Sequence, residues 1–263
     1  MENRHGFRHS VLRILKKKGV AVVGLVLAVA AIFYFVNDPA VVGASATARR
    51  LPIYCVQRDN KAVSLTFDAA WGDEDTQQLI DILAKYNVKA TFFVVGDWVE
   101  KYPESVKALH DAGHEVMNHS DDHAHFSKLS TADIIKNVNA CNDKIEKVTG
   151  VRPTLFRCPY GEYDDHVVNA LTSQGMHTIQ WDVDSLDWKE LSAAEITQRV
   201  TSKAAAGSIV LFHNAAKHTP EALPGIIEKL LADGFSLVPV SEILLQGEFE
   251  MDHTGRMCKK GSL

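Results

Sequence analysis

Cysteine is scarce in this sequence, and its spacing argues against two classes of protein. The four cysteines, Cys55, Cys141, Cys158 and Cys258, are spread over 263 residues with no C-x-x-C pair among them. This excludes a disulfide-dense scaffold and gives no support to a cysteine-bound zinc or redox motif. Cys141 falls on the apolar side of a predicted helix and is expected in the core. The sequence assigns no disulfide among the other three.

A glycine-rich phosphate loop is also missing after the first predicted strand, so nucleotide binding has no support. Acidic residues outnumber basic ones outside the N-terminus. Residues 1–18 hold six Lys or Arg and one Glu, a charge of +5, so the rest of the chain carries −10 within the total of −5. An acidic body argues against nucleic-acid binding, which needs a basic face.

One long uncharged apolar run, residues 20–36, follows the basic segment directly. A bilayer core needs about 20 apolar residues, with about 17 as the lower limit. We predict a basic cytoplasmic segment over 1–19, a transmembrane anchor over 20–36 and a stalk over 37–59, with the remaining chain outside the cytoplasmic membrane. A cleavable signal peptide is the alternative, because Ala44-Ser45-Ala46 resembles a processing site, although the run exceeds the usual h-region.

Strands and helices alternate from about residue 60. The composition, 46% hydrophobic and 23% charged, suits one globular domain. Predicted strands lie near 62–68, 90–95, 114–118, 154–156, 177–181, 208–212 and 235–239. About seven such alternations favour a β/α barrel or a doubly wound sheet over residues 60–246. Ser192 and Glu195 predict a capping box on one intervening helix, and the polar residues 247–263 are predicted to be a loose tail.

Several of these strands end on residues that can carry chemistry. They are, in order, Asp68, His119 with His123, Arg157 with Tyr160, Asp187 with Trp188, and His213. In a β/α barrel the carboxyl ends of the strands converge on one face, so these residues can surround one substrate. Two histidines four residues apart on one side of a helical turn can share a metal ion, although a polar surface turn has the same spacing.

The motifs resemble a known family in their order and spacing. The segments are Thr66-Phe67-Asp68, His119-Ser120-x-x-His123, Arg157-x-Pro159-Tyr160-Gly161, Asp184-Ser185-Leu186-Asp187-Trp188 and Leu211-Phe212-His213. Together they resemble the five motifs of polysaccharide deacetylases, the NodB homology domain of carbohydrate esterase family 4. The resemblance implies a distorted (β/α) barrel of about seven strands that hydrolyses the N-acetyl group of an amino sugar and releases acetate.

The resemblance also implies catalytic roles for particular residues. Asp68 is expected to be the catalytic base and His213 the general acid that protonates the departing amine. Arg157 is expected to orient Asp68, and Asp187 to tune His213.

Metal and substrate contacts follow in the same way. His119 and His123 are expected to bind a divalent metal, with zinc as the favoured ion. The backbone N–H of Tyr160 is expected to help hold the oxyanion, and Trp188 and Leu211 to wall the pocket for the acetyl methyl.

One departure from the family pattern concerns the metal. The family has a second Asp, a metal ligand, directly after the base, whereas this chain has Ala69. The ion is then bound weakly, recruits Asp68 itself, or takes a carboxylate such as Asp73, for which a helix cap is the simpler interpretation. The Phe-Asp-Ala-Ala-Trp-Gly version resembles the sporulation-associated branch of the family in Gram-positive bacteria.

These observations predict a membrane-anchored N-deacetylase that works outside the cytoplasm on an N-acetylated glycan, most plausibly peptidoglycan. The alternative is a metal-free glycan-binding domain at the cell surface that has lost catalysis through Ala69. Cleavage of O-acetyl groups by the same residues is a third hypothesis.

Overall fold

The computed structural model describes Tyr34 and residues 49–262 and divides the chain into two compact units, Met1–Arg49 and Arg50–Leu263. The predicted basic segment, the anchor apart from Tyr34, and most of the stalk lie outside the described residues. Among the residues that are described, no helix is both long and apolar enough to cross a membrane.

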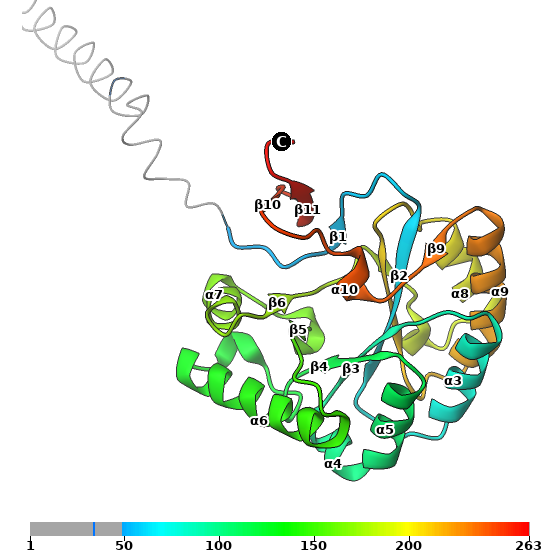
Figure 1. Ribbon diagram of the computed structural model, residues 1–263, viewed down its shortest axis with the longest axis horizontal. Helices are drawn as coiled ribbons and strands as arrows, with labels where there is room; N and C mark the ends of the chain where they lie inside the picture. Colours follow the sequence, from blue (N-terminus) through cyan, green and yellow to red (C-terminus); the bar gives the residue numbers. More distant parts are fainter. Residues whose placement is uncertain (1–33, 35–48, 263) are drawn as a thin grey trace, which may run out of the picture. The chain divides into compact units, whose positions relative to one another are not determined.

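The second unit is built on one parallel sheet with a long strand, β2 (Ala62–Ala69), at its centre (Figure 1). On one side follow β3 (Thr91–Val94), β4 (Glu115–Asn118), β5 (Leu155–Phe156) and β6 (His177–Thr178). On the other side follow β8 (Ile209–His213) and β7 (Val183–Asp184), and β9 (Ser236–Leu237) also pairs with β2. The path ends at β6 and β7, which form its two edges. The predicted alternation of strands and helices around a parallel sheet is therefore confirmed, and the distorted barrel is an open half-barrel.

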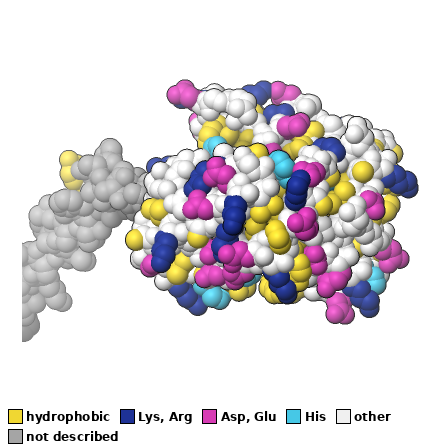
Figure 2. Space-filling model, turned by 60° about the horizontal axis from the view of Figure 1, so that its bottom comes forward, with side chains coloured by type: hydrophobic (Ala, Val, Ile, Leu, Met, Phe, Trp, Pro, Cys, Tyr) yellow, Lys and Arg dark blue, Asp and Glu magenta, His cyan; other side chains and the backbone are white. Residues whose placement is uncertain are grey.

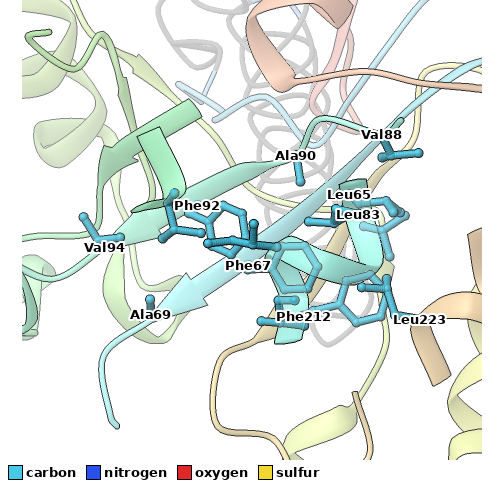
Figure 3. Close-up of a cluster of buried hydrophobic side chains, with 14 of the residues drawn as sticks. Leu65, Phe67, Ala69, Leu83, Val88, Ala90, Phe92, Val94, Phe212 and Leu223 are labelled. Carbon is cyan, nitrogen blue, oxygen red and sulfur yellow. The ribbon is translucent and has the colours of Figure 1, made fainter. Parts of the chain in front are cut away.

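Strand β2 is buried along its whole length, but its two faces differ in chemistry. Val63, Leu65 and Phe67 face the apolar core between sheet and helices. There the ring of Phe67 stacks on Phe92 and Phe212, with centroids 4.8 and 5.3 Å away (Figure 3). Alternate residues along a strand point to opposite faces, so Ser64, Thr66 and Asp68 share the other, inner face. This places one polar row inside the half-barrel.

Most of the helices cover the outer face of the sheet (Figure 1). They are α3 (Thr76–Lys85), α4 (Gly96–Lys101), α5 (Pro103–Asp111), α6 (Thr131–Thr149), α7 (Asp165–Ser173), α8 (Ala193–Thr201) and α9 (Thr219–Ala232). The short helix α10 (Val240–Ile243) instead packs Val240 and Ile243 against the inner-face cluster that contains Phe93. The predicted capping box is confirmed on α8, where the side chains and backbone of Ser192 and Glu195 bond reciprocally. Gly150 ends α6 at φ +74°, a conformation that glycine adopts without strain.

A second, three-stranded sheet joins the two ends of this unit. It consists of β1 (Cys55–Val56), β11 (Arg256–Lys259) and β10 (Phe249–Met251), with β1 and β11 parallel (Figure 1). The prediction of a loose tail is therefore wrong for residues 249–259. The reason is apolar anchoring, since Met257 and Val56 are both fully buried in one core cluster. All four cysteines are buried and unpaired.

Basic and acidic side chains are interspersed on the face shown in Figure 2. Several exposed ion pairs link such side chains on the surface of this unit, among them Lys107 with Asp111 and Arg152 with Asp143. Exposed pairs of this kind contribute at most about 1 kcal/mol each. The stability of the domain therefore rests mainly on its buried clusters.

Candidate active site

The chemistry-bearing residues gather at the carboxyl end of the half-barrel, on its inner face. The parallel register pairs Asp68 of β2 with His213 of β8. Two residues earlier on each strand, it pairs Thr66 with Leu211. Asn118, the last residue of β4, leads into His119, and Arg157 follows β5 directly. Asp68 and His213 thus lie side by side, although they are far apart in the sequence.

Asp68 is buried and ion-paired. Its Oδ1 lies 2.7 Å from Nη1 of Arg157, which is fully buried and also donates to the hydroxyl of Thr66 at 2.9 Å. The guanidinium lies over the ring of Phe93, 4.2 Å from its centroid. Burial is the largest single effect and raises the pKa of Asp68, but the charges of Arg157, His119 and His213 and the hydrogen bond from Arg157 together outweigh it and hold the pKa below its ordinary value. Asp68 is therefore a carboxylate at neutral pH.

His119 and His123 are brought together by a bend and not, as their spacing predicts, by a helical turn. His123 has φ +56°. The ring centroids of His119 and His123 lie 5.1 Å apart. The Nδ1 of His119 lies 2.8 Å from the carbonyl oxygen of Arg157. A carbonyl only accepts, so the proton is on Nδ1 and the lone pair is on Nε2. Burial lowers the pKa of both rings, that of His123 to about 4.

His213 is held by Asp187 through two contacts. Its Nδ1 lies 2.8 Å from Oδ1 of Asp187, and its backbone N–H donates to Oδ2 at 2.8 Å. The hydroxyl of Thr219 donates to the same Oδ2 at 2.7 Å. Burial lowers the pKa of His213, but the hydrogen bond to Asp187 and the charges of Asp68 and Asp187 raise it, and the net shift is upward. The ring is therefore prepared to hold a proton that it can donate.

Replacing Asp187 by asparagine is expected to lower the pKa of His213, because the charge that raises it is removed while the side-chain shape is kept. With a lower pKa, His213 loses its proton at a lower pH than in the wild type and can no longer act as an acid above that pH. For the acetate release that the family resemblance implies, the alkaline limb of the pH dependence should therefore move to lower pH. The matched control is Asp143→Asn, an exposed aspartate on α6. An alkaline limb that stays in place would contradict a tuning role for Asp187.

The three predicted substrate residues lie at different depths. Leu211 is buried on β8, two residues before His213 and on the same face. Trp188 directly follows Asp187 and is 57% exposed, with Nζ of Lys189 4.9 Å from its ring centroid. Tyr160, at φ +58°, is 58% exposed and packs its ring against His123 with centroids 4.5 Å apart.

The side chains around His119 offer two imidazoles and a carboxylate as donors for a metal ion. The Nε2 lone pair of His119 faces Oδ2 of Asp68 at 3.5 Å, and two such acceptors repel each other unless a cation or proton lies between them. Two neutral imidazoles and a carboxylate fit zinc or a similar ion by their chemistry. Throughout residues 49–262, however, no group of three or more His, Cys, Asp or Glu side chains is arranged to hold one.

Position 69 supplies no ligand, since the methyl group of Ala69 is buried among apolar side chains. Asp73 is not the cap of the next helix either. Asp75 occupies the N-cap of α3, so that prediction is wrong, and the Asp73 carboxylate accepts a hydrogen bond from Ser105 at 2.8 Å. These observations leave Asp68, His119 and His123 as the candidate donors.

Three supporting residues were not predicted from the sequence. They are Thr66, which holds Arg157; Thr219, which holds Asp187; and Asn214, which bonds the loop after Asp68. Thr66 carries a usable signal, because it lies two residues before Asp68 and so on the same face of the strand. Asn214 directly follows His213. Thr219 has no local signal, since only the start of α9 brings it to Asp187.

Comparison with known proteins identifies the group to which this site belongs. The family model described as polysaccharide deacetylase matches residues 56–179. The solved structure of a CE4 family pseudoenzyme from Bacillus anthracis is 38% identical, with 73% of this chain and 68% of that chain covered and a TM-score of 0.71. The chain belongs to the polysaccharide deacetylase family. The resemblance inferred from the five motifs is thereby confirmed.

Two further members of the polysaccharide deacetylase family are similar to this chain. The peptidoglycan-N-acetylmuramic acid deacetylase PdaC of Bacillus subtilis is 38% identical over 188 residues, which are 72% of this chain and 40% of that protein. The chain thus spans less than half the length of this relative. A solved peptidoglycan N-acetylglucosamine deacetylase is 30% identical, with 73% of this chain and 91% of that one covered and a TM-score of 0.71.

Proposed function

We propose that this chain is a polysaccharide N-deacetylase that removes acetyl groups from amino sugars of peptidoglycan. The observation that carries the proposal is the pairing of an ionised carboxylate, Asp68, with a protonatable imidazole, His213, on neighbouring strands. Amide hydrolysis needs a base for the attacking water and an acid for the leaving amine. The names of PdaC from Bacillus subtilis and of the solved N-acetylglucosamine deacetylase support peptidoglycan as the polymer.

In the proposed reaction, Asp68 accepts a proton from the water that attacks the acetyl carbonyl carbon. Arg157 keeps Asp68 ionised and oriented through its 2.7 Å contact. The backbone N–H of Tyr160 donates to the developing oxyanion. His213, oriented by Asp187, then donates its proton to the sugar nitrogen as the carbon–nitrogen bond breaks. The products are acetate and a free amine on the sugar, and Trp188 and Leu211 enclose the acetyl methyl.

His119 and His123 are the residues that would hold a divalent metal, with zinc as the favoured ion, and Asp68 is the carboxylate that faces Nε2 of His119. When bound, such an ion polarises the acetyl carbonyl and stabilises negative charge on its oxygen. Because Ala69 provides no ligand, the affinity is expected to be lower than that of a site with a second carboxylate.

Removing metal is expected to abolish acetate release, since the oxyanion then loses its main source of positive charge. The purified chain is treated with a chelator, and acetate released from peptidoglycan is measured before and after zinc, cobalt or manganese is added back. If acetate release recovers only at metal concentrations well above trace level, the result agrees with a lowered affinity of the site for metal. Full activity in the presence of chelator would contradict metal dependence.

A second candidate function is supported by the missing ligand at Ala69 and by the similarity to a CE4 family pseudoenzyme. In that case the domain binds glycan without cleaving it. A folded chain that retains glycan but releases no acetate with any metal favours this alternative. Acetate release from O-acetylated but not N-acetylated substrates favours the third hypothesis, ester cleavage.

The cellular setting belongs to the same proposal. The apolar run at residues 20–36 behind a basic segment supports a single-pass membrane anchor with the catalytic domain outside the cytoplasm. Cell-wall glycan is the N-acetylated polymer within reach of such an anchor. The Phe-Asp-Ala-Ala-Trp-Gly motif supports a role in sporulation.

A further inference from the structure

We propose that Trp71 is a sugar-binding residue that stacks on a pyranose ring beside the ring that is deacetylated. The inference rests on the proposed function in taking the ligand to be a glycan chain. Trp71 lies in the loop that follows Asp68, in the same motif that lacks the second carboxylate. The loop thus contributes an exposed indole next to the position where the family has a metal ligand.

The backbone around Trp71 is held in place from two sides. The side-chain amide of Asn214 donates to the carbonyl oxygens of Trp71 and Gly72 at 2.7 and 2.8 Å, and its oxygen accepts from the N–H of Ala70 at 3.2 Å. The indole N–H of Trp98 donates to the carbonyl oxygen of Gly72 at 2.5 Å. The loop is therefore ordered before any ligand arrives, which lowers the entropic cost of binding.

This fixed backbone presents an indole that is 63% exposed. Among the large apolar side chains of residues 49–262, the three most exposed aromatic rings are Trp71, Tyr160 and Trp188, all at the carboxyl ends of the strands. Trp71 packs edge-on against His123, with centroids 5.3 Å apart, and Tyr160 packs against the same imidazole at 4.5 Å. Two exposed rings thus flank a histidine of the candidate active site.

The chemistry of this pair favours a sugar as the ligand. A pyranose ring has an apolar face of C–H groups that packs flat on an aromatic ring, while its hydroxyls stay in water. Aromatic side chains with an apolar body are the common lining of such sites. The indole is beside His123 and outside the contacts of Asp68, Arg157 and His213. The ring it binds is therefore a neighbour of the one that reacts, and only a chain of linked sugars reaches both positions.

Binding of N-acetylglucosamine oligomers tests this assignment without requiring turnover. The full chain is titrated with the tetramer and the monomer by calorimetry. Trp71→Ala is expected to weaken binding of the tetramer about tenfold, the value of one stacking contact, and to leave binding of the monomer unchanged. Trp71→Phe keeps a flat ring and is expected to restore most of the affinity. The control is Phe249→Ala, which removes an exposed ring on β10.

Kinetics on the tetramer provide the second readout. The Trp71→Ala variant is expected to raise KM with little change in kcat, because the stacked ring does not react. Equal tetramer affinity in wild type and Trp71→Ala would overturn the proposal, as would an unchanged KM. A chain that releases no acetate, but loses tetramer affinity on Trp71→Ala, contradicts the deacetylase function while supporting the sugar-binding role. Normal acetate release by the wild type, together with unaltered tetramer binding by Trp71→Ala, supports the deacetylase function and overturns the sugar-binding role of Trp71.

Discussion

Replacing His213 by alanine is expected to reduce acetate release by about 10²- to 10⁴-fold, the range typical for loss of a general acid. Without the imidazole, the sugar nitrogen must leave as an unprotonated amine. The fold should persist, since Asp187 keeps its hydrogen bonds to the hydroxyl of Thr219 and to the backbone N–H of residue 213. Acetate release and the thermal unfolding midpoint are measured on the same sample.

His253→Ala is the matched control, because His253 is exposed in the turn between β10 and β11. It should leave both quantities unchanged. If the His213→Ala variant kept full activity, the assignment of the general acid would be wrong. If it lost activity together with its folded state, partial rescue of acetate release by added imidazole would separate a chemical role from a structural one.

Replacing Arg157 by methionine is expected to lower the free energy of unfolding by about 3–5 kcal/mol, as is usual when one partner of a buried ion pair is removed. The variant leaves the Asp68 carboxylate buried without its cation. The pKa of Asp68 should then rise above its value in the unfolded chain. Protonation of Asp68 removes the uncompensated buried charge. The variant should therefore approach wild-type stability as the pH falls and lose stability as the pH rises.

Urea unfolding of the single and double variants measures this effect. Adding Asp68→Asn to the Arg157→Met variant should recover stability, because the uncompensated charge is removed. Arg152→Met is the matched control, since Arg152 bonds Asp143 and Glu146 at the surface and should contribute less than about 1 kcal/mol. An Arg157→Met variant as stable as wild type at neutral pH would show that the pair contributes nothing net.

The elements of the half-barrel could be predicted because their signals are local. Strand β2 reads as an apolar run that ends on a carboxylate, and α6 carries a cap at Ser130 and a terminal glycine at Gly150. Parallel strands align their carboxyl ends, so Asp68 and His213 could be expected on one face. Their direct pairing depends on which strands are neighbours, and that order is fixed by packing along the whole chain.

The predictions that failed concern interactions between distant segments. The tail was expected to be loose because its composition is polar, yet the buried side chain of Met257 packs in one cluster with Val56 of β1. The N-cap position expected for Asp73 is occupied by Asp75, whose carboxylate makes no capping hydrogen bond and accepts from the N–H of Ala215 instead. The supports from Thr219 and Asn214 depend on tertiary contacts, which no spacing in the sequence reveals.

The pairing of β1 with β11 also has a consequence for the order in which the protein folds as it is synthesised. The neighbouring strands β2, β3 and β4 follow one another in the chain and can pair early. Cys55 of β1 pairs with Arg256 of β11, which comes far later in the chain and is synthesised after all the strands of the half-barrel. Contacts between distant residues form slowly, because a long loop must close first. The pairing of β1 with β11 is therefore expected to form after the half-barrel and to complete the fold of the domain.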